Sequence, residues 1–396
     1  MMDSLFQSVR PALILLCAMM LFNLPTLMYK IGMFLRGILY LLFCNDKKWR
    51  KPQDPFIVIG PILQKEKELD HTTDDDDVIE RKTIYFVRHG ESTWNDTFNK
   101  GSHRSQNAFI IGFIPGLIKA LLFELYLILS GKLDRYVRKS CVYLCILNRN
   151  FFLIPSRSFI CIYSWFYDAP TSTLGLNQVE NLSQFFKSTN VTTDSNNDKV
   201  AQHVAILKAS PEAPPSKLLS SNLRRAVSTM AGGFKTRLAR RPQEKILVVP
   251  SLQEISRNPD TLSITPAHMS IQASWIDKTS TICNFQSTFT NQVDMSLHLG
   301  NKPIGTNGLK RMREFCNFVF SSSVKEEYAI VGGHSIWFRS FFRTFLPYKS
   351  DHVGKTKKVV NCGVVAFTLL KVVRKSGQPT YMIDPNSVDV VYGGFD

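Results

Sequence analysis

The hydrophobic pattern contains four short apolar runs that end in polar residues, as buried strands do where they lead into loops or helices. They are "IYFV" at 84–87, "KLLSS" at 217–221, "ILVV" at 246–249 and "YAIV" at 328–331. The third run leads into a loop, and the other three are followed by predicted helices. Open α/β sheets usually bind their ligands at the carboxyl edge of the strands. The pattern therefore predicts an α/β domain whose site lies at that edge.

Two longer apolar runs lie near the N-terminus. Residues 11–29 carry no charge, and residues 31–44 carry one arginine before the basic cluster at 47–51. The first run is barely long enough to cross a bilayer, and Asn23 and Pro25 weaken it as a span. A signal peptide, a membrane anchor and interfacial helices backed by basic residues are open alternatives, with a buried apolar hairpin as a fourth.

Of these alternatives we expect membrane attachment through residues 1–52. If residues 11–29 span the bilayer, the basic cluster that follows them predicts a membrane-associated protein whose downstream domain faces the cytosol. Residues 53–82 include the acidic run Asp74–Asp77 and predict a solvated linker. We expect the main domain over residues 83–396.

A second apolar segment interrupts that domain at about 103–165. Residues 108–129 are apolar almost all round a predicted helix, and Lys100–Tyr167 holds nine Lys and Arg against two Asp and Glu. Apolar surface edged with cations suits an anionic membrane surface, and a helical cap buried on the domain is the alternative. Because the chain leaves near Asn95 and returns at Asp168 to finish one sheet, a single membrane crossing is excluded. A re-entrant helix, a surface-lying helix or a lid is expected.

Composition narrows the class of partner. The chain of 396 residues has 48 Lys and Arg against 32 Asp and Glu, a formal charge of +16, which favours an anionic partner. We do not expect nucleic acid, because the aromatic residues lie in apolar runs and are not interleaved with the basic ones. The eight cysteines are scattered without a C-x-x-C pair, which is typical of a reduced compartment and gives no zinc motif.

Two histidines follow predicted strands in the same way. His89 lies in "RHG" after the first strand, and His334 lies in "GGH" after the last of the four. Arg225, one turn into a predicted helix, can reach an anion near the strand edge, and Ser221 or Asn222 can cap that helix. These residue types at one sheet edge indicate a phosphate site.

Four motifs in this order resemble the histidine phosphatase superfamily, also called phosphoglycerate mutase-like. They are "RHGE" at 88–91, "SNLRRA" at 221–226, "LQE" at 252–254 and "GGH" at 332–334. The segment "DAPTSTLGLNQVENL" at 168–182 also resembles the family pattern, with Thr171 where leucine is usual. The resemblance implies a three-layer α/β/α domain with a mostly parallel central sheet, interrupted by the hydrophobic helical insert.

The resemblance also implies catalytic roles. His89 matches the nucleophile that forms a phosphohistidine, and neighbouring cations would favour its neutral form by lowering its pKa. Arg88, Arg225 and His334 match the clamp on the phosphoryl oxygens. Glu254 matches the acid that protonates the leaving oxygen and then activates water, for which its carboxyl must be held protonated.

Three further residues, Asn95, Ser92 and Ser335, are expected to bind substrate, although Ser335 stands where many members of the superfamily have glycine. No metal and no cofactor is expected, because cationic side chains supply the charge. The stretch after Glu254, "ISRNPDTLSIT", is unlike the corresponding segment of true mutases.

We therefore expect a metal-independent phosphatase that hydrolyses a phosphomonoester at a membrane surface. A phosphomutase and a membrane-tethered, non-catalytic phosphate-binding scaffold are the alternatives. The identity of the phosphorylated substrate and the oligomeric state stay open.

Overall fold

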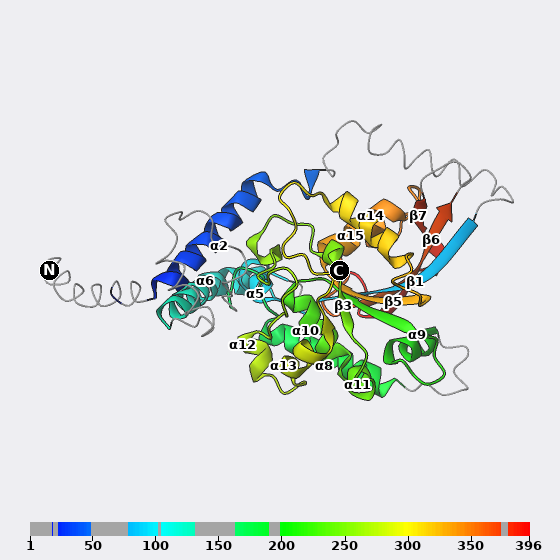
Figure 1. The fold of residues 1–396 in the computed structure, drawn as a ribbon, viewed down its shortest axis with the longest axis horizontal. Coiled ribbons are helices and arrows are strands. Elements are labelled where there is room, and N and C mark those ends of the chain that lie inside the picture. Colours follow the sequence, from blue (N-terminus) through cyan, green and yellow to red (C-terminus); the bar gives the residue numbers. More distant parts are fainter. Residues whose placement is uncertain are drawn as a thin grey trace.

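The computed structural model describes residues 18, 23–48, 78–101, 104–130, 163–189, 199–373 and 379–396. Its centre is an eight-stranded sheet in the order β4-β3-β2-β5-β1-β6-β7, with β8 paired to β6 (Figure 1). The strands are β1 (Val78–Arg88), β2 (Ser216–Ser220), β3 (Ile246–Val248), β4 (Val293–Asp294), β5 (Tyr328–Gly333), β6 (Val364–Val373), β7 (Thr380–Ile383) and β8 (Asp389–Tyr392). The strands from β4 to β1 pair in parallel, and β6 pairs antiparallel with β1, β7 and β8.

Helices cover both faces of the sheet. Successive side chains of a strand point to opposite faces, so alternate residues of β1 belong to two different cores. Tyr85 and Val87 pack in one core against α8 (Thr173–Ser188), α9 (Lys199–Lys208), α10 (Arg224–Gly233), α11 (Lys235–Arg240), α12 (Trp275–Thr279) and α13 (Phe285–Asn291). Ile84 and Phe86 pack in the other against α14 (Gly308–Val319) and α15 (Ser335–Phe345). The predicted three-layer α/β/α fold with a mostly parallel sheet is confirmed.

The domain begins earlier than the predicted residue 83. Strand β1 starts at Val78 and pairs along its whole first half with β6, from Val78 opposite Val373. The charged residues at its start were read as linker, but Glu80 forms an ion pair of 2.6 Å with Lys371 across the two strands. The rest of the predicted acidic linker, 53–77, lies outside the described residues.

Residues 24–43, which the sequence divides between two apolar runs, form one helix. Helix α2 (Leu24–Phe43) runs through Lys30 without a break, as a lysine permits, and the ammonium of Lys30 pairs with Glu124 of the insert at 2.6 Å. Pro25 does not interrupt the helix but lies in its first turn, where a missing N–H costs nothing. The predicted span at 11–29 lies mostly outside the described residues.

The insert forms helix α6 (Gln106–Leu129), as the apolar pattern predicts. It runs antiparallel beside α2: Asn23 at the start of α2 donates to the carbonyl of Leu129 at the end of α6 over 2.9 Å (Figure 1). One side of α6 rests on the domain, where Phe123 contacts Trp165 and Trp275. Residues 131–162 of the insert lie outside the described residues.

Both helices expose large apolar side chains. On α6 these are Ile110, Ile111, Ile114, Ile118, Leu121 and Leu122, and on α2 they include Phe34, Leu35, Leu41, Leu42 and Phe43. Ala120 and Leu127 are the buried residues of α6, so this helix is not a buried cap. Within the described part of the chain, α2 and α6 are two helices long and apolar enough to cross a membrane by length and composition.

Candidate active site

The paired strands β1 and β5 bring the two predicted histidines together. Arg88 and Gly333, the last residues of these parallel strands, lie opposite each other, so the next residue of each strand reaches the same point of the sheet edge. The imidazole centroids of His89 and His334 are 5.0 Å apart. The site therefore lies at the carboxyl edge that the strand pattern predicted.

The contacts of His89 define its tautomer. Its Nδ1 lies 2.6 Å from the carbonyl oxygen of Gly90, and its Nε2 lies 3.2 Å from Nε of Arg225. A guanidinium can only donate, so Nε2 accepts and Nδ1 carries the proton. Burial, followed by the charges of Arg225 and Arg88, lowers the pKa of His89 well below its ordinary value. The ring is therefore neutral, with its lone pair on Nε2.

Asp260 holds Arg225 in place. Nη1 of Arg225 donates to the carbonyl of Asp260 over 2.6 Å, and Nη2 lies 3.3 Å from its carboxylate. Burial raises the pKa of Asp260 to about 6, although the charge of Arg225 acts in the opposite direction. Sequence reasoning missed Asp260, because an aspartate after Asn-Pro in a loop carries no pattern that points to an arginine on α10.

His334 contacts the residue that directly follows β2. Its Nε2 lies 2.8 Å from the hydroxyl of Ser221, and burial with the charge of Arg225 lowers its pKa well below the ordinary value. The prediction that Ser221 or Asn222 caps the following helix is wrong. Leu223 occupies the N-cap position of α10 without a side-chain cap, and the Asn222 amide donates to Gln253 and the Gly300 carbonyl.

Glu254 lies at the N-terminus of α15, the helix that starts directly after His334. Its carboxylate oxygens accept hydrogen bonds from the backbone N–H of Trp337 at 2.9 Å, of Ile255 at 2.8 Å and of Ile336 at 3.2 Å. These bonds supply the cap that His334, the N-cap residue, does not provide. The motif at 252–254 marks Glu254 but does not predict that its side chain caps a helix.

Arg88 extends the positive side of the site. Its Nη1 donates to the carbonyl of Val359 over 2.6 Å, while its Nε has no hydrogen-bond partner among the described residues. Burial lowers the pKa of Arg88 to about 10, so the guanidinium keeps its charge at neutral pH.

The residues expected to bind substrate have other contacts. Ser92 is the N-cap of α5 (Thr93–Phe98), where its hydroxyl accepts from the N–H of Asn95 over 3.2 Å. The side-chain oxygen of Asn95 accepts from the amide of Asn99 over 2.7 Å. Ser335 is the first residue of α15 and is 8% exposed. The structure thus joins His89, Arg225 and His334 directly, whereas Ser92 and Asn95 have local contacts within α5.

Backbone contacts fix the loop that carries His89. A Cβ on Gly90 would lie 2.6 Å from the carbonyl oxygen of Gly175, so the start of α8 approaches only because this residue has no side chain. The N–H of Gly90 donates to Thr229 over 2.9 Å, and the amide of Asn361 donates to the carbonyl of His89 over 3.1 Å. These supporting residues come from three distant segments, and apart from the "DAP…G" segment no sequence motif marked them.

Comparison with known proteins gives a likeness of structure alone. No family model and no curated protein matches the sequence. Similar solved structures include the ecdysone phosphate phosphatase of Bombyx mori in complex with tungstate, at 15% identity over 80% of this chain and 98% of that chain, with a TM-score of 0.32. A mycobacterial glucosyl-3-phosphoglycerate phosphatase with VO3 is 12% identical over 76% of this chain and 97% of that chain, with a TM-score of 0.31.

A third similar structure is a phosphoserine phosphatase of Entamoeba histolytica in complex with 3-phosphoglyceric acid, at 11% identity over 76% of this chain and 96% of that chain, with a TM-score of 0.28. These proteins are members of the superfamily that the sequence motifs resemble. At such identities and TM-scores, the function of this chain has to be inferred from its own residues. Among the described residues, no group of three His, Cys, Asp or Glu could hold a metal ion.

Proposed function

We propose that this chain is a histidine phosphatase that hydrolyses a phosphomonoester through a phosphohistidine at Nε2 of His89. The observation that supports it most directly is the arrangement around that atom. Its lone pair faces the Nε–H of Arg225, the proton of the ring is bound at Nδ1 by Gly90, and the ring is 3% exposed. An anion that displaces the Arg225 contact would meet a neutral nucleophile and a guanidinium at the same point.

In the first step, Nε2 of His89 attacks phosphorus as the bond to the leaving oxygen breaks. The leaving oxygen takes a proton from Glu254, and the charge on the phosphoryl oxygens is stabilised by Arg88, Arg225 and His334. The products are the alcohol and a phosphohistidine.

In the second step, water attacks phosphorus and the P–N bond breaks. Glu254 accepts the proton from water, and phosphate leaves with His89 restored to its neutral form. Transfer to a second alcohol in place of water would make the protein a mutase, and the departure from the mutase pattern after Glu254 favours hydrolysis.

The chemistry is tested with p-nitrophenyl phosphate on the full chain and on His89→Ala. We expect the substitution to abolish hydrolysis and the acid-labile phosphoryl label that the wild type acquires from substrate. Equal activity in both proteins would falsify the catalytic proposal. A wild type that binds phosphate without turnover would favour the non-catalytic scaffold instead.

We further propose that α2 and α6 place this domain on an anionic membrane surface, with the catalytic domain on the cytosolic side. The two helices lie side by side and expose apolar side chains such as Phe34 and Ile111, which are 68% and 75% exposed. A helix of 24 residues is about 36 Å long, enough for a membrane contact along its length. Lys30 and Glu124 neutralise each other between the helices.

Vesicle flotation tests the membrane contact. Phe34→Glu with Ile111→Glu should lower recovery on phosphatidylserine vesicles several-fold, because two charges would enter the apolar face. Val390→Glu, a matched change at an exposed apolar residue of β8, should leave recovery unchanged. Equal recovery of both variants would show that α2 and α6 do not form the lipid contact.

A further inference from the structure

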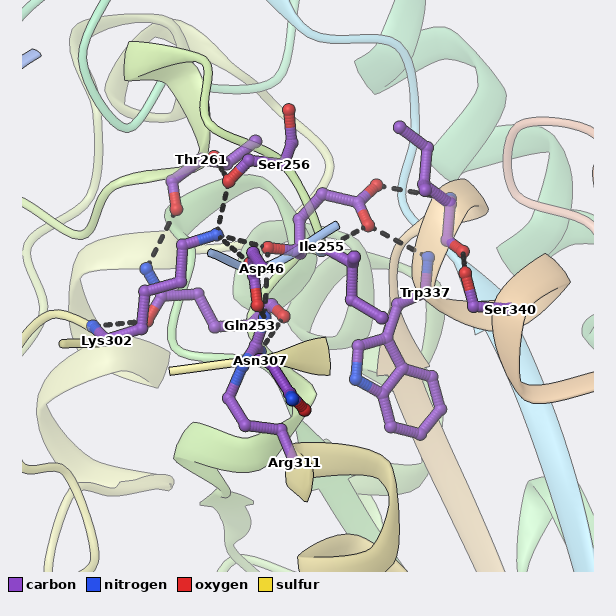
Figure 2. Close-up of polar contacts among 12 residues, drawn as sticks. Asp46, Gln253, Ile255, Ser256, Thr261, Lys302, Asn307, Arg311, Trp337 and Ser340 are labelled. Carbon is purple, nitrogen blue, oxygen red and sulfur yellow. Dashed lines mark hydrogen bonds and ion pairs between the residues drawn. The ribbon is translucent and has the colours of Figure 1, made fainter. Parts of the chain in front are cut away.

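A buried carboxylate joins the N-terminal helix to the interior of the domain. Asp46 follows the end of α2 by a short turn, is 0% exposed, and binds two cations of the domain (Figure 2). Its carboxylate lies 2.6 Å from Nζ of Lys302, and both of its oxygens lie 2.7 Å from Nη2 of Arg311. Asp46 belongs to the segment that the sequence assigned to the membrane, and no motif marked it.

The two cations hold the main chain around Glu254. Nζ of Lys302 donates to the carbonyl oxygens of Glu254 and Ser256, over 2.5 Å and 2.6 Å. Nη1 of Arg311 donates to the carbonyl of Gln253, and its Nη2 lies 3.4 Å from that of Glu254. The backbone on both sides of the Glu254 side chain is therefore fixed by groups that Asp46 binds.

Charge balance makes Asp46 necessary for this arrangement. The side chains of Lys302, Arg311 and Asp46 are each at most 5% exposed, so two positive charges share one buried counter-charge. Burial lowers the pKa of Lys302, and the charge of Asp46 acts against that shift. Without the carboxylate, two buried cations would face each other with only carbonyl dipoles as partners, an arrangement that is strongly destabilising.

Further contacts join the C-terminal end of α2 to Lys302 and to the segment that follows Glu254. The hydroxyl of Tyr40 donates to the carbonyl of Lys302, and Arg257 donates to the carbonyl of Leu41 over 3.3 Å. Tyr40 also packs with Leu262 and Ile264, which follow Asp260 in the sequence. The chain from Gln253 to Ile264 thus lies between α2 and the histidines, and it carries both Glu254 and the partner of Arg225.

We infer that Asp46 is a positioning residue for Glu254. It keeps Lys302 and Arg311 in place, and they fix the backbone that aims the Glu254 carboxyl toward the leaving oxygen. This inference rests on the proposed phosphatase function. It makes the end of the N-terminal apolar helix a part of the acid–base machinery, acting through two buried cations.

The test compares two probes that differ in their need for an acid. The leaving group of p-nitrophenyl phosphate departs without a proton, whereas the alkoxide of β-glycerol phosphate requires one. A misplacement of about 1 Å can cost about 10²-fold in rate. Asp46→Asn should therefore lower kcat on β-glycerol phosphate by roughly 10-fold to 10²-fold more than on p-nitrophenyl phosphate, in the same sense as Glu254→Gln.

A second variant covers a failure of Asp46→Asn to fold. Lys302→Met leaves Asp46 and Arg311 as a balanced pair while it removes the bonds to the carbonyls of Glu254 and Ser256, and it should give the same selective loss. Lys30→Gln is the matched control, because it removes from α2 a charge whose hydrogen bonds go to Glu124 and the carbonyl of Tyr163 and not to residues 253–256. Its ratio of activities on the two probes should equal that of the wild type.

The outcomes separate the inference from the proposed function. If Glu254→Gln is selective but Asp46→Asn or the folded Lys302→Met lowers both activities equally, the residues are structural and the inference is overturned. If Glu254→Gln itself is not selective, or His89→Ala keeps full activity, the proposed function fails first. Selective loss in both Asp46→Asn and Lys302→Met, with none in Lys30→Gln, supports the positioning role.

Discussion

At the scale of single residues, the proposed catalysis depends on a histidine that stays neutral. His89 has its pKa lowered well below 6.5 by burial and by two arginines, and its proton is confined to Nδ1. Because the folded imidazole resists protonation, the nucleophilic form persists as the pH falls through the range in which an exposed histidine gains its charge.

We therefore predict that kcat/KM on p-nitrophenyl phosphate shows no loss with a midpoint near pH 6.5, once the ionisation of the substrate is corrected for. The acid limb should begin well below that value. The measurement is a pH–rate profile from pH 8 to pH 5. An acid limb centred near pH 6.5 in the wild type would contradict the prediction, because it is the limb expected of a histidine that titrates like an exposed one.

The pH dependence of stability is a poorer probe of the site, because the buried histidines and the buried acidic residues contribute with opposite signs. His89 and His334 have lowered pKa values, so below pH 6.5 the unfolded state binds more protons and their contribution to stability falls with the pH. Glu91 and Asp260 have pKa values raised to about 7 and about 6, mainly by burial. Their folded forms bind protons first, so their contribution rises as the pH falls toward 4.5 and partly cancels the effect of the histidines.

At the scale of elements, the four residues of β1 from Ile84 to Val87 are fully buried, and Phe86 packs on one face of the strand. The ring is fully buried and contacts Trp337, Phe338, Phe341 and Phe342 of α15 as well as Phe367 of β6. It therefore fixes α15, whose N-terminus binds Glu254, against the strand that leads to His89. Strand β1 thus contributes both to the core and to the proposed active site.

We predict that Phe86→Ala lowers the free energy of unfolding by about 3–5 kcal/mol, because the substitution leaves a cavity between β1 and α15. Ile79→Ala, at a 38% exposed residue of the same strand, should cost less than about 1 kcal/mol. Urea unfolding followed by tryptophan fluorescence measures both. Similar losses for the two variants would mean that the aromatic cluster does not stabilise the contact between β1 and α15.

The central strands and the two histidines can be predicted from the sequence, whereas the two buried aspartates that support the site cannot. The strands were predictable because the central ones are buried on both faces and read as continuous apolar runs. His89 and His334 followed from their equivalent places after β1 and β5. Asp260 and Asp46 were not predictable, because their importance lies in contacts with residues distant in sequence; Asp46 and Arg311 are 265 positions apart. A buried aspartate in a polar loop has the same local pattern as an exposed one.

At the scale of the whole molecule, helix α2 and Asp46 of the N-terminal segment contribute to the interior of the domain. Helix α2 packs on the segment after Glu254, and its last turn leads to the buried Asp46. Within the segment over 1–52 that the sequence predicts to associate with a membrane, the part from α2 to Asp46 supplies core residues and a buried counter-charge.

Two truncations test this. Deleting residues 1–22 leaves α2 and every later named element, and we predict an unfolding temperature and p-nitrophenyl phosphatase activity close to those of the full chain. Deleting 1–52 removes Asp46 and exposes Leu262 and Ile264, so we predict a large drop in unfolding temperature and loss of activity. Thermal unfolding by circular dichroism is the measurement. A stable, active 1–52 deletion would show that the domain is complete without α2.

The two ends of the insert meet on the domain, and this has a consequence for how the protein arose. Ser92 forms a β-bridge with Thr171, the N–H of Thr93 donates to the carbonyl of Pro170, and Trp165 donates to the hydroxyl of Thr97 over 3.0 Å. The chain leaves and re-enters the domain at residues that are hydrogen-bonded to each other. The residues between these two ends therefore form a single inserted segment, or cassette. An ancestral domain could gain or exchange such a cassette without disturbing the order of its strands, as is common for insertions into surface loops. In sequence, the apolar surface of α6 is therefore separate from the strands that lead to His89 and His334.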